Sequence, residues 1–222
     1  MRVGPPAWRW PGSGAGAAER LRGCGKGNLD MTEMIVALLQ NSILAASAEY
    51  FRWSNGVVLY DVGAENILQV YAARHCFESL RAAGHNAVVR LERPINELVE
   101  GGEGRLDLTV EVYQVLYCIE LKRYANPASV NPDLDRLDQV ILGHQNRVGL
   151  FGAPCYLYLN NDHNNWPANW VHDRNIENEQ YGPNGDSWRA TDPIALPWEV
   201  PGQRSHHSAM VVVVGHRAEP RA

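Results

Sequence analysis

Apolar side chains recur every three or four positions in three stretches of the chain, and this spacing predicts amphipathic helices. The first covers residues 32–51, and the second covers residues 64–83, where Gly84 ends it. The third covers about 131–147, with Pro132 at its first helical position.

Short apolar runs between turn-forming residues predict strands, at residues 57–60, 88–91, 154–159 and 207–216. A hairpin of two alternating strands, 105–112 and 115–122, precedes the third helix. The order is helix, strand, helix, strand, hairpin, helix, strand, strand. It predicts an α/β fold with a central mixed β-sheet flanked by helices.

Two segments lack any such period. Residues 1–30 are rich in Gly, Pro and Arg, which predicts a disordered tail, with an upstream extension of the reading frame or a basic recruitment tail as alternatives. Residues 160–206 are rich in Asn, Trp, Pro and Gly, which predicts a long irregular segment. Its tryptophans either fix it to the domain or stack on nucleic-acid bases. The remainder, residues 31–222, is expected to form a single domain.

Length and charge narrow the function classes. A chain of 222 residues suits one medium-sized domain, and its apolar runs are shorter than the roughly 20 residues of a membrane span, so we expect a cytoplasmic protein without a membrane partner. The net charge is −5, with +3 in residues 1–30 and −8 in the remainder. Such an acidic body argues against a protein that coats nucleic acid by bulk charge. The four cysteines form no CxxC pair, so no cysteine zinc site is indicated.

The hairpin has a register that can be worked out. If Tyr113 and Gln114 form its turn, the apolar residues of both strands face one another on one side, from Val112 opposite Val115 to Leu106 opposite Leu121. The same register places Asp107 opposite Glu120 and Arg105 opposite Lys122 on the other side. Tyr-Gln is not a preferred two-residue turn, so a bulge or a longer turn is the alternative.

Two facing carboxylates require a positive charge between them. Unit charges about 4 Å apart interact by roughly 4 kcal/mol at an effective dielectric constant near 20. A divalent cation would remove this repulsion, and oxygen ligands suit Mg²⁺ or Mn²⁺. Lys122 could then orient or deprotonate a metal-activated water, which is the chemistry of phosphodiester hydrolysis.

The same residues allow other interpretations. Asp107 and Glu120 could be solvated on the outer face of the hairpin, with Lys122 and Arg105 as countercharges. The fold could also serve a catalytically silent binding or regulatory module, and a small-molecule hydrolase could use the same carboxylates.

The order of these residues resembles the restriction-endonuclease-like superfamily, known by its PD-(D/E)xK motif. Asp107 stands in one strand and Glu120-Leu121-Lys122 in the next, while Leu106 replaces the proline of the motif. The resemblance covers roughly residues 34–159. It implies a restriction-endonuclease-like core with Asp107, Glu120 and the Leu121 carbonyl as metal ligands, and Lys122 beside the attacking water.

Two further residues enter through this resemblance. Glu65 matches the glutamate of the family's first core helix and would assist metal or water binding, although an acidic residue in a first helical turn also favours the helix dipole. Gln139 lies where related nucleases often place a polar residue near the substrate. We therefore expect a Mg²⁺- or Mn²⁺-dependent endonuclease acting on nucleic acid, with DNA preferred; a homodimer is one assembly that this interpretation allows.

Overall fold

The structure is a computed structural model of the 222-residue chain. It describes residues 28–54, 65–122, 127–142, 144–158, 187–190, 194–195 and 205–215, without the side chains of 28–30, 51, 127–131, 154–158 and the last three strands. The strand predicted at 57–60 and residues 1–27 of the predicted tail lie outside the described residues. Two units can be distinguished, residues 1–35 and residues 36–222, and helix α2 crosses the boundary between them.

Helix α2 (Asn28–Trp53) confirms the first predicted helix and begins inside the segment that was expected to be disordered. Its buried residues include Leu39, Ile43 and Ala46, which lie three or four positions apart. The stretch Met31–Tyr50 is long and apolar enough to cross a membrane, although core helices of soluble proteins meet the same criterion and half of this stretch is buried. A search for uninterrupted apolar runs misses this stretch, because polar residues interrupt it. Most of these polar residues are uncharged, so the mean hydropathy of the stretch stays high.

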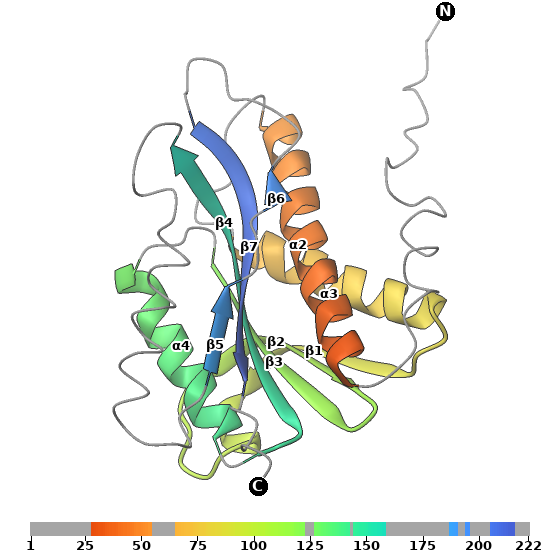
Figure 1. Ribbon diagram of the computed structural model, residues 1–222, viewed down its shortest axis with the longest axis vertical. Helices are drawn as coiled ribbons and strands as arrows, with labels where there is room; N and C mark the ends of the chain where they lie inside the picture. The colour runs from red at the N-terminus through yellow and green to blue at the C-terminus, as the bar shows by residue number, and fades with distance from the viewer. Residues whose placement is uncertain are drawn as a thin grey trace, which may run out of the picture. The chain divides into compact units, whose positions relative to one another are not determined.

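Within the described residues, seven strands form a mixed sheet in the order β1-β2-β3-β4-β7-β5, with β6 also paired to β7 (Figure 1). Only β3 and β4 pair in parallel among the described strands. The expected mixed sheet is thus present. The strand bounds are Ala87–Pro94 for β1, Arg105–Val112 for β2, Val115–Leu121 for β3, Arg147–Tyr158 for β4, Ser187–Ala190 for β5, Ile194–Ala195 for β6 and Ser205–Gly215 for β7.

The hairpin register is confirmed over part of its length. Tyr113 and Gln114 have φ angles of 51° and 65°, so both adopt the left-handed conformation that suits a two-residue hairpin turn. Residues 108–112 pair with 115–119 as predicted. Pairing ends at Leu108 opposite Ile119, however, so the predicted pairs of Asp107 with Glu120 and of Arg105 with Lys122 do not form.

The expectation of a solvated outer face on the hairpin is wrong for β3. Cys118 and Glu120, on one face, are 0% and 1% exposed, and Tyr117 and Ile119, on the other, are 0% exposed. The reason is that β3 lies inside the sheet between β2 and β4, with helices packed against it (Figure 1). Glu120 is therefore a buried acid rather than a surface one.

Helix α3 (Glu65–Ala82) packs against β1, β2 and β3, and α4 (Pro127–Ile141) packs against β3, β4 and β7. As predicted, α3 ends just before Gly84, which has a φ of 84°. The predicted bounds of the third helix are wrong, because Pro127 rather than Pro132 takes its first position.

Helix α4 also ends earlier than predicted, and its C-terminal end is held by an arginine. The Arg147 guanidinium donates hydrogen bonds to the carbonyl oxygens of Val140 (2.7 Å) and Leu98 (3.1 Å). It thereby satisfies the Val140 carbonyl, which lies in the last turn of α4 and has no hydrogen-bond donor within the helix. Arg147 is the first residue of β4, so the chain turns from helix to strand where the periodicity suggested further helix. The segment predicted to be irregular contains β5 and β6 and part of β7; its other residues lie outside the described ones.

Candidate active site

The site lies where β2 and β3 stop pairing. Asp107 has no paired residue in the β2–β3 ladder or in the β1–β2 ladder. In β1 the corresponding position is Glu92, whose φ of 51° is uncommon for a residue with a side chain. Local departures of this kind often accompany functional sites because they free a residue from regular pairing. Here they leave the Asp107 carboxyl free to bond with side chains and with the β3 backbone.

Both oxygens of Asp107 accept hydrogen bonds. Gln69 Nε2 of α3 donates to Oδ1 over 2.8 Å, and the Leu121 amide donates to Oδ2 over 2.7 Å. Burial raises the pKa of Asp107 above its ordinary value, although the Leu121 hydrogen bond and the Lys122 charge oppose that shift. Asp107 is thus a half-buried, fixed carboxyl group at the point where the strands separate.

Glu120 is the most deeply buried acid of the site. Its side chain is 1% exposed, and Oε1 lies 2.8 Å from Arg136 Nη1 of α4. Burial, together with the neighbouring charge of Asp107, raises the pKa of Glu120 to about 8, while Arg136 works in the opposite direction. The mutual effect of Asp107 and Glu120 on their pKa values indicates that the two carboxyl groups are close neighbours, as the sequence predicts, although strand pairing does not bring them together.

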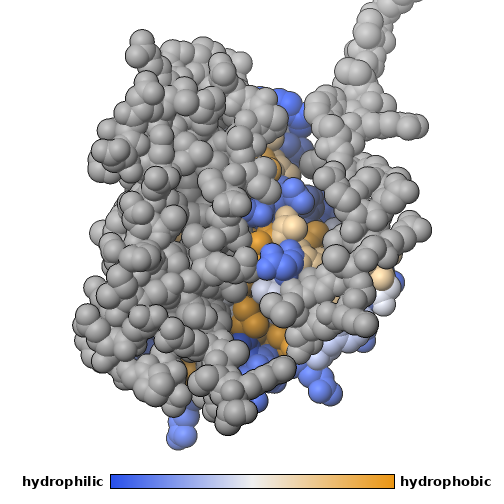
Figure 2. All heavy atoms as spheres, viewed as in Figure 1, coloured by the Kyte–Doolittle hydropathy of each residue, from blue (hydrophilic) through white to orange (hydrophobic). Residues whose placement is uncertain are grey.

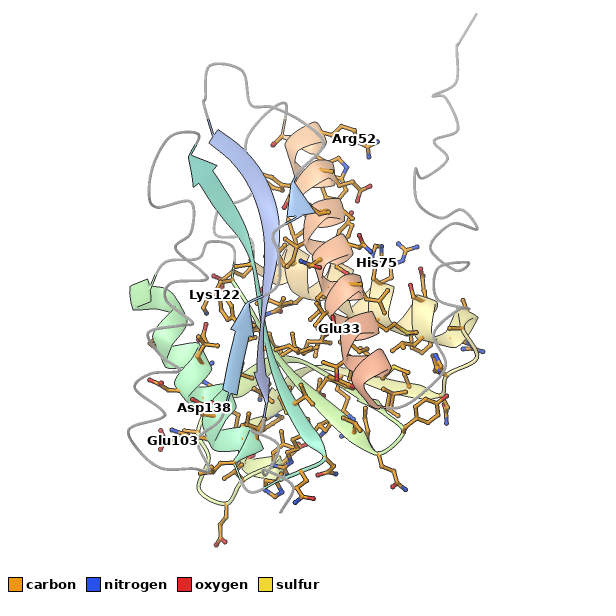
Figure 3. The ribbon with its side chains drawn as sticks, viewed as in Figure 1. Glu33, Arg52, His75, Glu103, Lys122 and Asp138 are labelled. Carbon is orange, nitrogen blue, oxygen red and sulfur yellow. The ribbon has the colours of Figure 1, made fainter. Side chains whose placement is uncertain are left out.

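Lys122 follows directly after β3 and points toward acidic residues of two helices. Its Nζ lies 3.1 Å from Asp133 Oδ2 of α4 and 3.9 Å from Glu65 Oε2 of α3. Burial by itself would lower the pKa of Lys122, but Asp133, Glu65 and Asp107 together raise it. The side chain is therefore held as an ammonium ion; Figure 3 labels it at the end of β3, on the side of α4.

Helix α4 contributes two charged residues that the sequence interpretation missed. Asp133 is 3% exposed, and its Oδ1 lies 3.5 Å from Nη1 of Arg136, one turn further along. A signal for Asp133 was present: it falls at helical spacing on the stripe of buried Leu137 and Val140, where an acid needs a partner. Gln69 was missed as well, although it lies one turn after Glu65.

Together these residues form a continuous series of opposite charges. In order it consists of Glu65, Lys122, Asp133, Arg136 and Glu120, with Asp107 next to Glu120 and Lys122. If all were ionised, four carboxylates would face two cations, leaving an excess of two negative charges. We call this group the acidic cluster. A divalent ion would balance its charge.

The remaining predicted residues stand as follows. Gln139 is exposed on α4 and outside the acidic cluster, so a contact with substrate there remains a prediction. Leu121 is buried and uses its amide to hold Asp107, while its proposed role as a metal ligand concerns the carbonyl oxygen. On the described part of the face shown in Figure 2, hydrophilic and apolar residues are intermixed.

The donor chemistry of the cluster fits a hard divalent cation, since Asp107 and Glu120 offer neighbouring carboxyl oxygens. Its present arrangement does not complete such a site. Within the described residues, no group of three or more His, Cys, Asp or Glu side chains is placed to hold a metal ion. Arg136 instead provides the positive charge next to Glu120.

Comparison of the sequence with family models and with curated proteins, and of the structure with solved structures, finds no match.

Proposed function

We propose that this chain is a metal-dependent phosphodiesterase that hydrolyses nucleic acid, with DNA as the preferred substrate. The observation that carries the proposal is the meeting of a half-buried carboxyl group, a buried carboxyl group and an ammonium ion where β2 and β3 separate. The arrangement of Asp107 and Glu120-Leu121-Lys122 on neighbouring strands, after a helix that begins with Glu65, resembles restriction-endonuclease-like nucleases.

Asp107, Glu120 and the Leu121 carbonyl are the residues that would hold Mg²⁺ or Mn²⁺. When bound, such an ion lowers the pKa of a water ligand and neutralises charge on a phosphate. The buried position of Glu120 excludes bulk water from one side of the carboxyl pair. Asp107 would keep its orientation through the Gln69 and Leu121 hydrogen bonds.

The environment of Lys122 favours one of its two expected roles. Because neighbouring carboxylates raise its pKa, Lys122 stays protonated and is poorly suited to remove a proton. An ammonium ion can instead orient the attacking water and stabilise negative charge on the phosphate. Glu65, 3.9 Å from Lys122 Nζ, then acts as a positioning residue for this ammonium ion.

The proposal is tested by incubating purified full-length protein with Mg²⁺ or Mn²⁺ and with plasmid, linear duplex, single-stranded DNA and RNA. Cleavage should require the metal and should disappear in Asp107→Asn and Lys122→Met. Glu111→Gln, which alters an exposed acid on the same strand as Asp107, is the matched control and should cleave normally. Metal-independent cleavage, or full activity in either site variant, would contradict the proposal.

The second candidate is a silent module that retains the fold without catalysis. It is favoured by the contact of Arg136 with Glu120, which fills the position of a counter-cation without any metal. A calorimetric Mn²⁺ titration separates the two functions. A nuclease should bind the ion and lose this binding in Asp107→Asn, whereas a silent module should show no heat of binding in either protein.

A further inference from the structure

Arg136 occupies an unusual position for an arginine on a helix surface. A single nitrogen, Nη1, lies 2.8 Å from Glu120 Oε1 and 3.5 Å from Asp133 Oδ1. Both acids are almost fully buried, with side chains 1% and 4% exposed, while the arginine side chain is 32% exposed. The guanidinium therefore reaches inward from a partly exposed position, so it can move away from Glu120 without unfolding of the helix.

The placement of Arg136 follows from the charge of the cluster. The carboxylates of Glu120, Asp133 and Asp107 all act on Arg136 and stabilise its positive charge. When Asp107 and Glu120 are both ionised they need a cation nearby, and either a guanidinium or a divalent ion can provide it. Both would use the carboxyl group of Glu120, and two positive charges at one carboxyl group repel each other.

We propose that Arg136 is the resident counter-cation of the proposed metal site, and that a divalent ion binds to Asp107 and Glu120 only when Arg136 moves from Glu120 to Asp133. This inference rests on the proposed function. Arg136 thereby sets the metal affinity of the site, and Asp133 holds the displaced arginine.

Asp133 is suited to receive the guanidinium. It stands three residues before Arg136 on α4, so the two side chains lie on the same helix face. Their present separation of 3.5 Å can shorten through a change in the arginine side chain alone. Asp133 already pairs with Lys122, and its two oxygens can accept from both cations.

The first test follows the arginine Nε–Hε resonances of the wild-type protein by NMR during a Mg²⁺ titration. The resonance absent from the Arg136→Lys spectrum belongs to Arg136, and it should shift in step with metal binding. The resonances of Arg74, in an exposed pair with Glu78, and of Arg147, bound to backbone carbonyls, are controls that should stay in place. Asp107→Asn should abolish the shift of Arg136.

The second test measures Mn²⁺ affinity by calorimetry at pH 8.5. Arg136→Gln removes the competing cation, so it should bind Mn²⁺ more tightly by roughly tenfold, which corresponds to about 1.4 kcal/mol. Arg105→Gln is the control, because Arg105 is exposed and donates to the Glu92 carbonyl instead of the cluster. It should leave the affinity within about twofold.

The outcomes separate the two proposals. If the wild type binds the metal while the Arg136 resonance stays in place, the inference about Arg136 is wrong and the proposed function stands. Equal Mn²⁺ affinity of the wild type and Arg136→Gln would also show that the inference about Arg136 is wrong, and it would leave the proposed function standing. If the wild type binds neither Mg²⁺ nor Mn²⁺, both proposals fail. Should Arg136→Gln not fold, the titration of the wild type still decides the question.

Discussion

The Leu121 amide donates a hydrogen bond to Asp107 Oδ2 over 2.7 Å, in place of a bond to the backbone of β2. This one contact both ends the hairpin ladder and fixes the carboxyl group beside Glu120. On its other side, Leu121 remains paired with β4, and the Lys122 amide bonds to the Gly152 carbonyl over 2.9 Å. Strand β3 is therefore anchored on β4 where it leaves β2.

The loss of stability caused by replacing Asp107 should depend on whether the new side chain keeps a hydrogen-bond acceptor. Asp107→Ala leaves the Leu121 amide and Gln69 without their partner, which should cost about 1–3 kcal/mol in the free energy of unfolding. Asp107→Asn keeps one carbonyl oxygen and should lose less. Urea unfolding at pH 7 measures both; equal loss in the two variants would mean that these hydrogen bonds contribute little.

The metal-free protein should become less stable as pH rises from about 4.5 to about 8. The pKa of Glu120 is raised from 4.5 to about 8 in the folded state, so in this range the folded state binds more protons than the unfolded state. The slope from this group is at most about 1.4 kcal/mol per pH unit. Thermal unfolding across this range should show the decline.

Glu120→Gln removes the titrating group and should flatten the pH dependence. Glu111→Gln, which alters an exposed residue of β2, should keep the slope of the wild type. A slope that is the same in Glu120→Gln and in the wild type would show that Glu120 is ionised in the folded protein at neutral pH.

The contribution of Lys122 to the stability of the fold should be separable from its contribution to cleavage. Lys122→Met leaves Asp133, which is 3% exposed, without its 3.1 Å ion pair, and should destabilise the fold by about 1–3 kcal/mol. Lys122→Arg restores a positive charge, so it should recover much of the stability. Its bulkier group should not restore cleavage, which we expect to fall on the order of a hundredfold. Full activity in Lys122→Arg would show that charge alone is sufficient.

Arg147 provides a test of a purely structural arginine. Arg147→Met leaves the carbonyls of Val140 and Leu98 without this donor, and should lower the free energy of unfolding by about 1–3 kcal/mol. Calorimetric Mn²⁺ affinity should match that of the wild type under conditions where the variant is folded. A large change in affinity would place Arg147 within the site.

The spacing of apolar residues was sufficient to predict the hairpin and two of the helices. The alternation of residues 105–122 determined the hairpin register up to Leu108 and Ile119, because a slip of one residue would exchange the two faces of a strand. The helix period located α2 and α3. The start of α4 was misplaced, because Pro127 and Pro132 both suit a first helical turn and periodicity cannot choose between them.

The sequence named the residues of the cluster that lie in or next to the hairpin and, through the family resemblance, Glu65 of α3. Asp107, Glu120 and Lys122 could be named from strand alternation, and the structure brings them and Glu65 into one cluster. Asp133 and Arg136 come from a helix whose rotation and bounds decide which side chains meet the sheet. Their pairing with Lys122 and Glu120 is a tertiary contact, which local spacing does not contain.

Because the Lys122 ammonium contacts acids of both α3 and α4, one side chain links two helices that are separated by more than forty residues of sequence. Altering it in a living cell would therefore lower the amount of intact protein together with any chemical change. Phenotypes of strains that carry such alleles must be compared at equal steady-state protein levels.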